Sequence, residues 1–312
     1  MIPLAPFFPT RRPLPLAWAA QCWEMLLLSR IWVASCVAAL CGFCALFLRL
    51  DEVLLPSLYL AFFATLCLYN LDDCFDCAQQ PRASGRAGCA AHGWGAACAG
   101  LCVVGQLYQA GWLARSVIGG GLALCTLYGA PLLRASLRPK RVGGLKAPFV
   151  GIAVALGVVL VPLCLAGATR YWFQEVATFL LLFTCLALLC TANALLSDVP
   201  DAAEDARRGI FSVAVRRGPR VARRRSRQLC GLCLLLILAW ATVSFPSVPQ
   251  LLSLCALFCA ALALTAQAPH VSFASSRHQL ALGVDAVLVI PLLLQGFFAL
   301  LTSAGVWSLS GP

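Results

Sequence analysis

Residues 173–205 read FQEVATFLLLFTCLALLCTANALLSDVPDAAED, and this stretch decides the fold. Its part 173–196 is predominantly apolar and matches the roughly 20 residues that a helix needs to cross a bilayer, whereas a barrel strand needs about ten residues in alternation. Asp198, Asp201 and Asp205 follow directly. On a helix this spacing places all three carboxylates on one face. We therefore expect a membrane-spanning helix that ends in an acidic surface.

Apolar stretches of this kind recur along the chain, which has 312 residues, 61% of them hydrophobic and only 11% charged. A soluble domain carries about 25% charged residues. We expect membrane spans at roughly 29–50, 54–71, 91–110, 113–133, 147–167, 173–196, 229–245, 248–267 and 279–302. The sequence therefore predicts an all-α, polytopic membrane protein with about nine transmembrane helices.

The basic residues predict the orientation of these helices. If the N-terminus is cytoplasmic, only Arg49, Arg115 and Arg170 of the 23 Lys and Arg residues fall on the opposite side, which leaves 23 − 3 = 20 in the cytoplasm. Cytoplasmic loops of membrane proteins carry such an excess. The net charge of +11 then reflects topology and contact with anionic lipids. Nucleic-acid binding is disfavoured because the basic residues are spread over many loops.

We expect one membrane domain over residues 29–302, with short segments on either side of it. Residues 1–28 form a proline-rich tail followed by an interfacial segment, and a transit peptide there stays possible; residues 303–312 form a C-terminal tail. The long loops, at about 72–90, 134–146 and 197–228, all fall on the cytoplasmic side. Both acidic clusters are therefore expected at the cytoplasmic face.

The acidic residues are concentrated in two clusters that share a spacing. Of twelve acidic residues, seven lie in or beside them: Asp72, Asp73, Asp76, Asp198, Asp201, Glu204 and Asp205. Carboxylates on one face repel each other unless a cation or basic partners lie between them. Magnesium is commonly held between carboxylates and a substrate's phosphates. A solvated acidic loop neutralised by nearby arginines is the alternative, and the shared spacing favours the cation site.

The second cluster and its continuation from Asp198 to Gly218 resemble the second signature of the UbiA superfamily of intramembrane prenyltransferases. Tyr128 and Pro131, followed by a run of Lys and Arg, are similar to the loop after the fourth span in that family. The first cluster departs from the family pattern, because Asp72 stands where Asn is expected and Gln80 replaces the last Asp. Gln offers a carbonyl oxygen but no charge.

The resemblance implies a UbiA-like bundle that transfers an isoprenyl group from a polyprenyl diphosphate to an aromatic or other polar acceptor. Magnesium would assist departure of the diphosphate, with ligands Asp73, Asp76, Asp198, Asp201 and Asp205. Asp198, Asp201 and Lys146 are implied as catalytic. The implied substrate-binding residues are Arg82, Tyr128, Lys140, Arg141 and Arg208. The lipid bilayer is the expected environment, and acceptor, donor length and oligomeric state stay open.

Two other classes of function remain as alternatives. A degenerate family member or a transporter would bind isoprenoid lipids without turnover, which the Gln80 departure keeps possible. A CDP-alcohol phosphotransferase also gathers Asp residues at a membrane surface. Its signature requires Gly after the second Asp of the motif, whereas Ala202 follows Asp201 here.

Several further residues are candidates for sites of their own. Cys74, Cys77, Cys89 and His92 have a zinc-like spacing, but with 18 cysteines in the chain such spacing arises easily by chance. Cys230 and Cys233 lie in a predicted span, where thiols pack as small apolar groups. Asp285 is an ionisable residue within the last span, which is typical either of a functional site or of a structural partnership. The arginines of 207–227 indicate topology, with contact to anionic head groups as the alternative.

Overall fold

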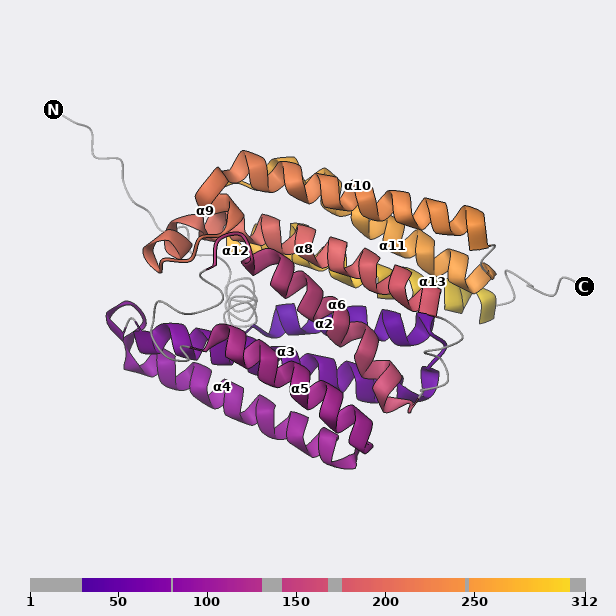
Figure 1. The fold of residues 1–312 in the computed structure, drawn as a ribbon, viewed down its shortest axis with the longest axis horizontal. Helices are drawn as coiled ribbons and strands as arrows, with labels where there is room; N and C mark the ends of the chain where they lie inside the picture. Colours follow the sequence, from indigo (N-terminus) through magenta and orange to yellow (C-terminus); the bar gives the residue numbers. More distant parts are fainter. Residues whose placement is uncertain (1–29, 80, 131–141, 168–175, 245–246, 304–312) are drawn as a thin grey trace, which may run out of the picture.

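The computed structural model describes residues 30–79, 81–130, 142–167, 176–244 and 247–303, and this part of the chain is helical without strands. Its long helices are α2 (Ile31–Phe47), α3 (Leu54–Gln79), α4 (Pro81–Gln109), α5 (Trp112–Gly129), α6 (Lys146–Leu165), α8 (Val176–Arg207), α10 (Pro219–Ser244), α11 (Val248–Gln267) and α13 (Ile290–Ser303). They form one bundle of roughly aligned helices (Figure 1). The predicted all-α class is confirmed.

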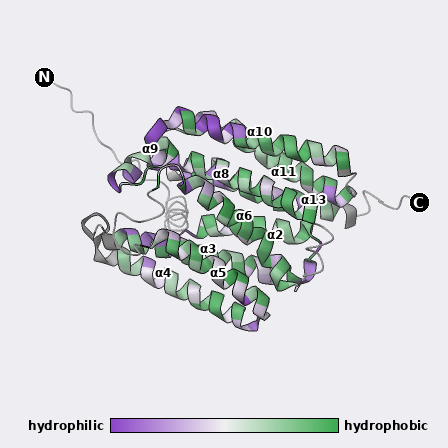
Figure 2. Cartoon of the chain, viewed as in Figure 1, coloured by the Kyte–Doolittle hydropathy of each residue, from purple (hydrophilic) through white to green (hydrophobic). Residues whose placement is uncertain are grey.

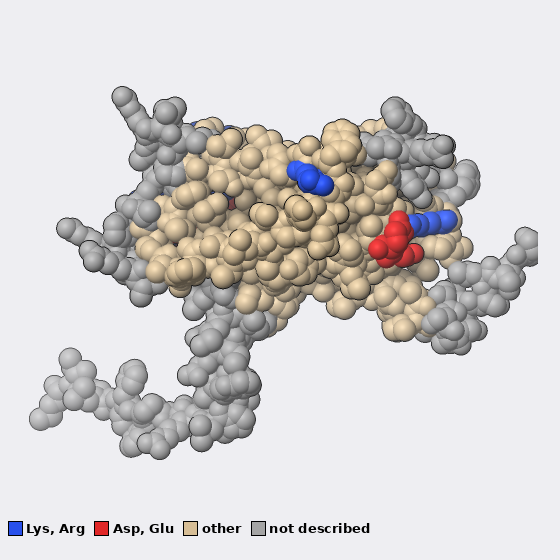
Figure 3. All heavy atoms as spheres, turned by 90° about the horizontal axis from the view of Figure 1, so that it is seen from below, with Lys and Arg blue, Asp and Glu red and all other residues tan. Residues whose placement is uncertain are grey.

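Among the described residues, six stretches are long and apolar enough to cross a membrane: Asp51–Cys77, Lys146–Leu165, Val176–Arg207, Pro219–Val243, Val248–His270 and His278–Leu300. α2 is apolar but shorter. Figure 3 shows one long side of the molecule on which uncharged atoms predominate, as expected of a surface that faces lipid. The described part is thus the fold of a multi-pass membrane protein. The count of nine spans and the cytoplasmic N-terminus stay predictions.

Two of the predicted long loops are largely helical, which corrects the sequence prediction. α3 continues to Gln79 and α4 begins at Pro81; α8 continues to Arg207, and the short α9 (Val213–Arg217) leads into α10 at Pro219. Hydropathy marks where the apolar stretch ends, but backbone hydrogen bonds carry a helix on into the polar region. Figure 2 shows these hydrophilic extensions at one end of the bundle, around α9 and the start of α10.

α8 ends in a glycine-dependent cap directly after the second acidic cluster. Gly209 has a φ of +69°, its N–H donates to the carbonyl of Ala206, and the N–H of Ile210 donates to the carbonyl of Asp205. This pair of bonds is a Schellman motif, which requires a left-handed residue and so favours Gly. The hydroxyl of Ser212 then accepts the N–H of Val215 and begins α9. The glycine and serine of the signature therefore serve as helix end and helix start.

α2 and α6 bring the middle of the bundle together. α2 is buried over most of its length and packs against α3, α6 and α13. α6 packs closely on α8 at Gly151, where an added Cβ would lie 2.6 Å from the backbone nitrogen of Thr191. Only glycine allows that approach. The contact fixes the start of α6 beside the end of α8.

The last predicted span is not one regular helix, which is a second correction. It consists of α12 (Arg277–Gly283), a 3₁₀ segment η5 (Asp285–Val289) and α13. Two side chains from other helices donate to carbonyls at this interruption: Trp32 Nε1 to Ala281 O at 3.1 Å and Asn193 Nδ2 to Val284 O at 3.0 Å. Interrupted helices within a bilayer are stable where neighbouring side chains supply such hydrogen bonds.

Candidate functional site

A cavity of about 390 Å³ lies where α3, α5, α6 and α8 meet α2 and η5, and both acidic clusters line it. The helical spacing of each cluster turns its carboxylates toward the same space. The charged and polar lining residues are Arg30, Tyr69, Asp72, Asp73, Asp76, Thr126, Tyr128, Lys146, Asn193, Ser197, Asp198, Asp201, Asp205, Arg208 and Asp285. Apolar residues complete the wall, among them Val37, Val150 and Leu288.

The structure brings together most of the site residues that the sequence suggested. Those that line the cavity are Asp73, Asp76, Tyr128, Lys146, Asp198, Asp201, Asp205 and Arg208. Gln80, Lys140, Arg141 and the side chain of Arg82 lie outside the described residues. Two clusters that are 125 residues apart in the chain (198 − 73) thus form one surface.

Lys146 holds the second cluster together. Its Nζ lies 2.8 Å from Asp198 Oδ1 and 2.8 Å from Asp205 Oδ2. The two carboxylates are seven residues apart on α8, which places them on one face two turns from each other. One ammonium at the first turn of α6 therefore bridges two carboxylates of α8 and offsets one of their two negative charges.

Two arginines hold the first cluster. Arg30 donates from Nε to Asp73 Oδ2 at 2.8 Å and from Nη2 to Asp73 Oδ1 at 3.0 Å. This two-bond geometry is the strongest form of Arg–carboxylate pairing. Arg208 donates to Asp76 Oδ2 at 3.2 Å and to Glu204 Oε1 at 2.8 Å. Arg208 therefore links the end of α8 to α3, and with it one cluster to the other.

Both guanidinium groups are held in their charged form. Burial lowers the pKa of Arg30, but the hydrogen bond and negative charge of Asp73 outweigh it, so the pKa is raised above its usual value. Burial likewise opposes ionisation of Arg208, and the charge of Asp76 with the hydrogen bond to Glu204 raises its pKa. These arginines stay available as anion-binding groups at every physiological pH.

The described lining carries more negative than positive charge. Seven Asp residues against Arg30, Lys146 and Arg208 give a formal balance of 3 − 7 = −4. Two polar atoms there are buried without a hydrogen-bond partner: Asp198 Oδ2 and Tyr128 Oη. The Tyr128 ring is stacked on Phe149 with centroids 3.7 Å apart, which fixes its direction. Excess charge and unpartnered oxygens indicate a site that a cation and a polar ligand would complete.

The donor set fits magnesium. It consists of carboxylate oxygens, the hard ligands that this ion prefers, and two divalent ions would balance the four excess charges. Within the described ranges no three or more His, Cys, Asp and Glu side chains form a ready-made metal site. Magnesium rarely uses a full protein cage; one or two carboxylates, waters and substrate phosphates are usual. The spacing of Cys74, Cys77, Cys89 and His92 gives no such group either; His92 instead contacts Asn70 at 3.0 Å.

Two residues of the site were missed as site residues in the sequence. In the sequence, Arg30 was counted only among the cytoplasmic positive charges. It stands at the start of the first apolar stretch, and in the structure it pairs with Asp73. Asn193 is a polar residue inside an otherwise apolar span, five positions before Asp198. A polar group at such a position is expected to have a partner. That signal would have indicated Asn193.

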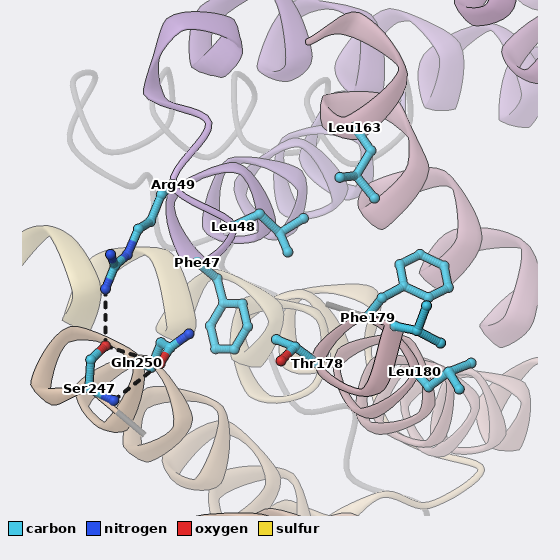
Figure 4. Close-up of a pocket in the computed structure, with 10 residues that line it drawn as sticks. Phe47, Leu48, Arg49, Leu163, Thr178, Phe179, Leu180, Ser247 and Gln250 are labelled. Carbon is cyan, nitrogen blue, oxygen red and sulfur yellow. Dashed lines mark hydrogen bonds between the residues drawn. The ribbon is translucent and has the colours of Figure 1, made fainter. Parts of the chain in front are cut away.

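A second cavity, of about 490 Å³, lies at the opposite end of the bundle. Phe47, Leu163, Phe179 and Leu180 give it apolar walls, and Arg49 points toward Ser247, whose Oγ accepts its hydrogen bond at 3.1 Å (Figure 4). Its volume is of the same order as that of the acidic cavity, but Arg49 is its single described charge. The chemistry therefore belongs to the acidic cavity.

Comparisons with known proteins point in one direction. The model of the UbiA prenyltransferase family matches residues 77–282. The fold is similar to the apo structure of a UbiA homolog from Aeropyrum pernix K1, with a TM-score of 0.60, 16% identity, and coverage of 83% of this chain and 98% of that chain. It is also similar to a digeranylgeranylglyceryl phosphate synthase, with a TM-score of 0.53, 14% identity, and coverage of 88% and 97%. No curated protein sequence matches.

Proposed function

Because the chain belongs to the UbiA prenyltransferase family, we propose that it transfers an isoprenyl group from a polyprenyl diphosphate to an aromatic or other polar acceptor within the membrane. One observation carries this proposal: two acidic clusters and three cations line a single cavity whose remaining wall is largely apolar. A diphosphate head and an isoprenoid tail require these two surroundings side by side. We place the cavity mouth at the cytoplasmic face, on the distribution of basic residues.

We assign the following roles to the residues of the cavity. Asp73, Asp76, Asp198, Asp201 and Asp205 hold the metal. Lys146 and Arg208 neutralise diphosphate oxygens, and Tyr128 donates its unpartnered hydroxyl to one of them. Arg82, Lys140 and Arg141 are proposed to add positive charge at the mouth. Asp198 and Asp201 keep the diphosphate in the orientation from which the allylic C–O bond breaks.

Magnesium, when bound, supplies the positive charge that stabilises the departing diphosphate. The protein's own contribution is to orient the donor and to exclude water. Val37, Val150 and Leu288 offer an apolar wall against which the allylic end of the donor can lie. Such a wall protects a carbocation from hydrolysis until the acceptor attacks.

A second candidate function is binding of isoprenoid lipids without turnover. It is favoured by the first cluster, where Arg30 and Arg208 already neutralise Asp73 and Asp76 and a metal would have to displace them. The altered Gln80 points the same way. Membership of the UbiA family leaves the CDP-alcohol phosphotransferase alternative without support.

The two candidates are distinguished by turnover. Purified protein in nanodiscs is incubated with radiolabelled geranylgeranyl diphosphate, magnesium and a panel of phenolic and glycerol-phosphate acceptors, and diphosphate release and prenylated products are measured. We expect magnesium-dependent release that is lost in Asp198→Ala and in Asp76→Ala and retained in Asp51→Asn, an exposed site outside the cavity. Tight donor binding with no release in the wild type would reject the enzyme and favour the lipid-binding protein.

A further inference from the structure

Asp285 lies at the interruption of the last span and lines the acidic cavity, away from the two clusters in sequence. The residue follows Val284, where the chain leaves α12 and enters η5. A carboxylate only accepts hydrogen bonds and cannot satisfy the carbonyls that the interruption exposes. Trp32 and Asn193 donate to the carbonyls of Ala281 and Val284 instead. Asp285 is therefore not needed to repair the broken helix.

Asn193 holds the backbone directly before Asp285. Its amide donates to the carbonyl of Val284 at 3.0 Å. The groups that act on Asp285 through charge are Arg30, which attracts it, and Asp201, which repels it. Arg30 makes its two hydrogen bonds to Asp73, and Lys146 makes its contacts to Asp198 and Asp205. Asp285 thus adds a carboxylate to the cavity in which the diphosphate is proposed to bind.

Prenyl transfer includes a step to which no residue has yet been assigned, the removal of a proton from the acceptor. When the C–O bond of the donor breaks, its electron pair leaves with the diphosphate. A lone pair of the acceptor then forms the new bond to the allylic carbon, and the O–H or N–H bond of the acceptor must release a proton. A positioned carboxylate within hydrogen-bond reach is a suitable general base.

We propose that Asp285 binds the acceptor and takes up this proton, and that the acceptor is a neutral molecule with a hydroxyl or amino group at the reacting position. The proton passes to water when the product leaves. An acceptor that carries its own carboxylate or phosphate near Asp285 would meet repulsion from Asp285 itself and from Asp201, the other negative charge that acts there. This inference rests on the proposed function and names the class of acceptor for the same site.

The test separates donor ionisation from transfer. Full-length protein with geranylgeranyl diphosphate and magnesium is given hydroquinone, which is neutral, or 4-hydroxybenzoate, which is anionic. We expect the wild type to prenylate hydroquinone at least tenfold faster. Asp285→Asn keeps the size of the side chain but cannot act as a base. It should lower transfer to hydroquinone at least tenfold, and any loss of donor-only diphosphate release should be much smaller than this loss of transfer.

Two further variants distinguish a base from a structural residue. Asp285→Glu should regain part of the transfer rate, and added formate should rescue Asp285→Ala, because a small carboxylate can occupy the vacated space. If Asp285→Asn transferred the isoprenyl group at the wild-type rate, or if the wild type used both acceptors equally well, this inference would be overturned. The proposed function would still stand. A wild type that releases diphosphate but prenylates neither acceptor would also overturn this inference. A wild type without magnesium-dependent diphosphate release would overturn the proposed function itself and this inference with it.

Discussion

The ammonium of Lys146 lies 2.8 Å from Oδ1 of Asp198, while Oδ2 of the same carboxylate is buried without a hydrogen-bond partner. A buried carboxylate with one unused oxygen is costly unless a further ligand approaches it. Lys146 therefore occupies part of the space that a divalent cation and a phosphate would fill. Its second contact, to Asp205, means that Lys146 reduces the electrostatic repulsion between Asp198 and Asp205.

Replacement of this ammonium by Lys146→Met should destabilise the metal-free protein. Two carboxylates would then face each other without compensation, at a cost of roughly 2 kcal/mol for a pair that is partly exposed. Magnesium should restore much of the lost thermal stability, since it can take the place of the ammonium. The check is thermal unfolding of wild type and variant, each with and without magnesium. A concentration of about 10 mM is used so that it exceeds the dissociation constant of a protein-bound divalent ion. An identical magnesium effect on both proteins would contradict it.

Asp198→Asn should abolish most of the turnover without unfolding the protein. The amide keeps the size of the side chain but removes the charge that Lys146 and the metal require, and we expect a loss of about 10²–10³-fold in kcat. Asp51→Asn is the matched control, because Asp51 is exposed in η1 at the opposite end of α3. Rates of diphosphate release for both variants decide the matter. Retained activity in Asp198→Asn would remove this residue from the proposed machinery.

The sequence predicted the helices well wherever an apolar stretch and a helix end together. The predicted span 248–267 coincides with α11, whose start is fixed by the capping box of Ser247 and Gln250. The sequence predicted the C-terminal ends of α3 and α8 poorly. These helices continue through polar residues to Gln79 and Arg207, whereas hydropathy indicates only where the apolar part ends. The interruption at Val284 carries no proline. It depends on Trp32 and Asn193, which are distant in the chain.

The site was predictable to the extent that helical spacing decides it. Asp198, Asp201 and Asp205 had to share a face, and they line one cavity. The pairing of Arg30 with Asp73 was not predictable, because it joins residues 43 positions apart through the packing of α2 on α3. The same holds for Lys146, whose two partners on α8 follow from the close approach of α6 at Gly151.

Restoration of the missing charge by Gln80→Asp should strengthen magnesium binding to the first cluster. The substitution gives the first cluster the spacing of the second, with a third carboxylate in place of an uncharged amide. We expect the magnesium concentration for half-maximal diphosphate release to fall by roughly threefold to tenfold, since each added ligand charge raises affinity for a divalent ion. Gln109→Asp is the control, because it adds the same charge at an exposed position at the end of α4, outside the cavity. An equal effect of both substitutions would show that only net charge matters.

The close approach of α6 to α8 should tolerate no added methyl group at Gly151. A Cβ there would lie 2.6 Å from the backbone nitrogen of Thr191, so the helices must separate, at a cost of about 1–3 kcal/mol.

Gly157 lies on the same helix with nothing within 4 Å of an added Cβ, and Gly157→Ala should be neutral or slightly stabilising through helix propensity, by up to about 1 kcal/mol. Thermal unfolding compares the two variants. Because α6 also carries Lys146, the separation caused by Gly151→Ala moves the ammonium away from Asp198, and diphosphate release should fall as well. A Gly151→Ala protein as stable and active as Gly157→Ala would mean that the contact with Thr191 does not position Lys146.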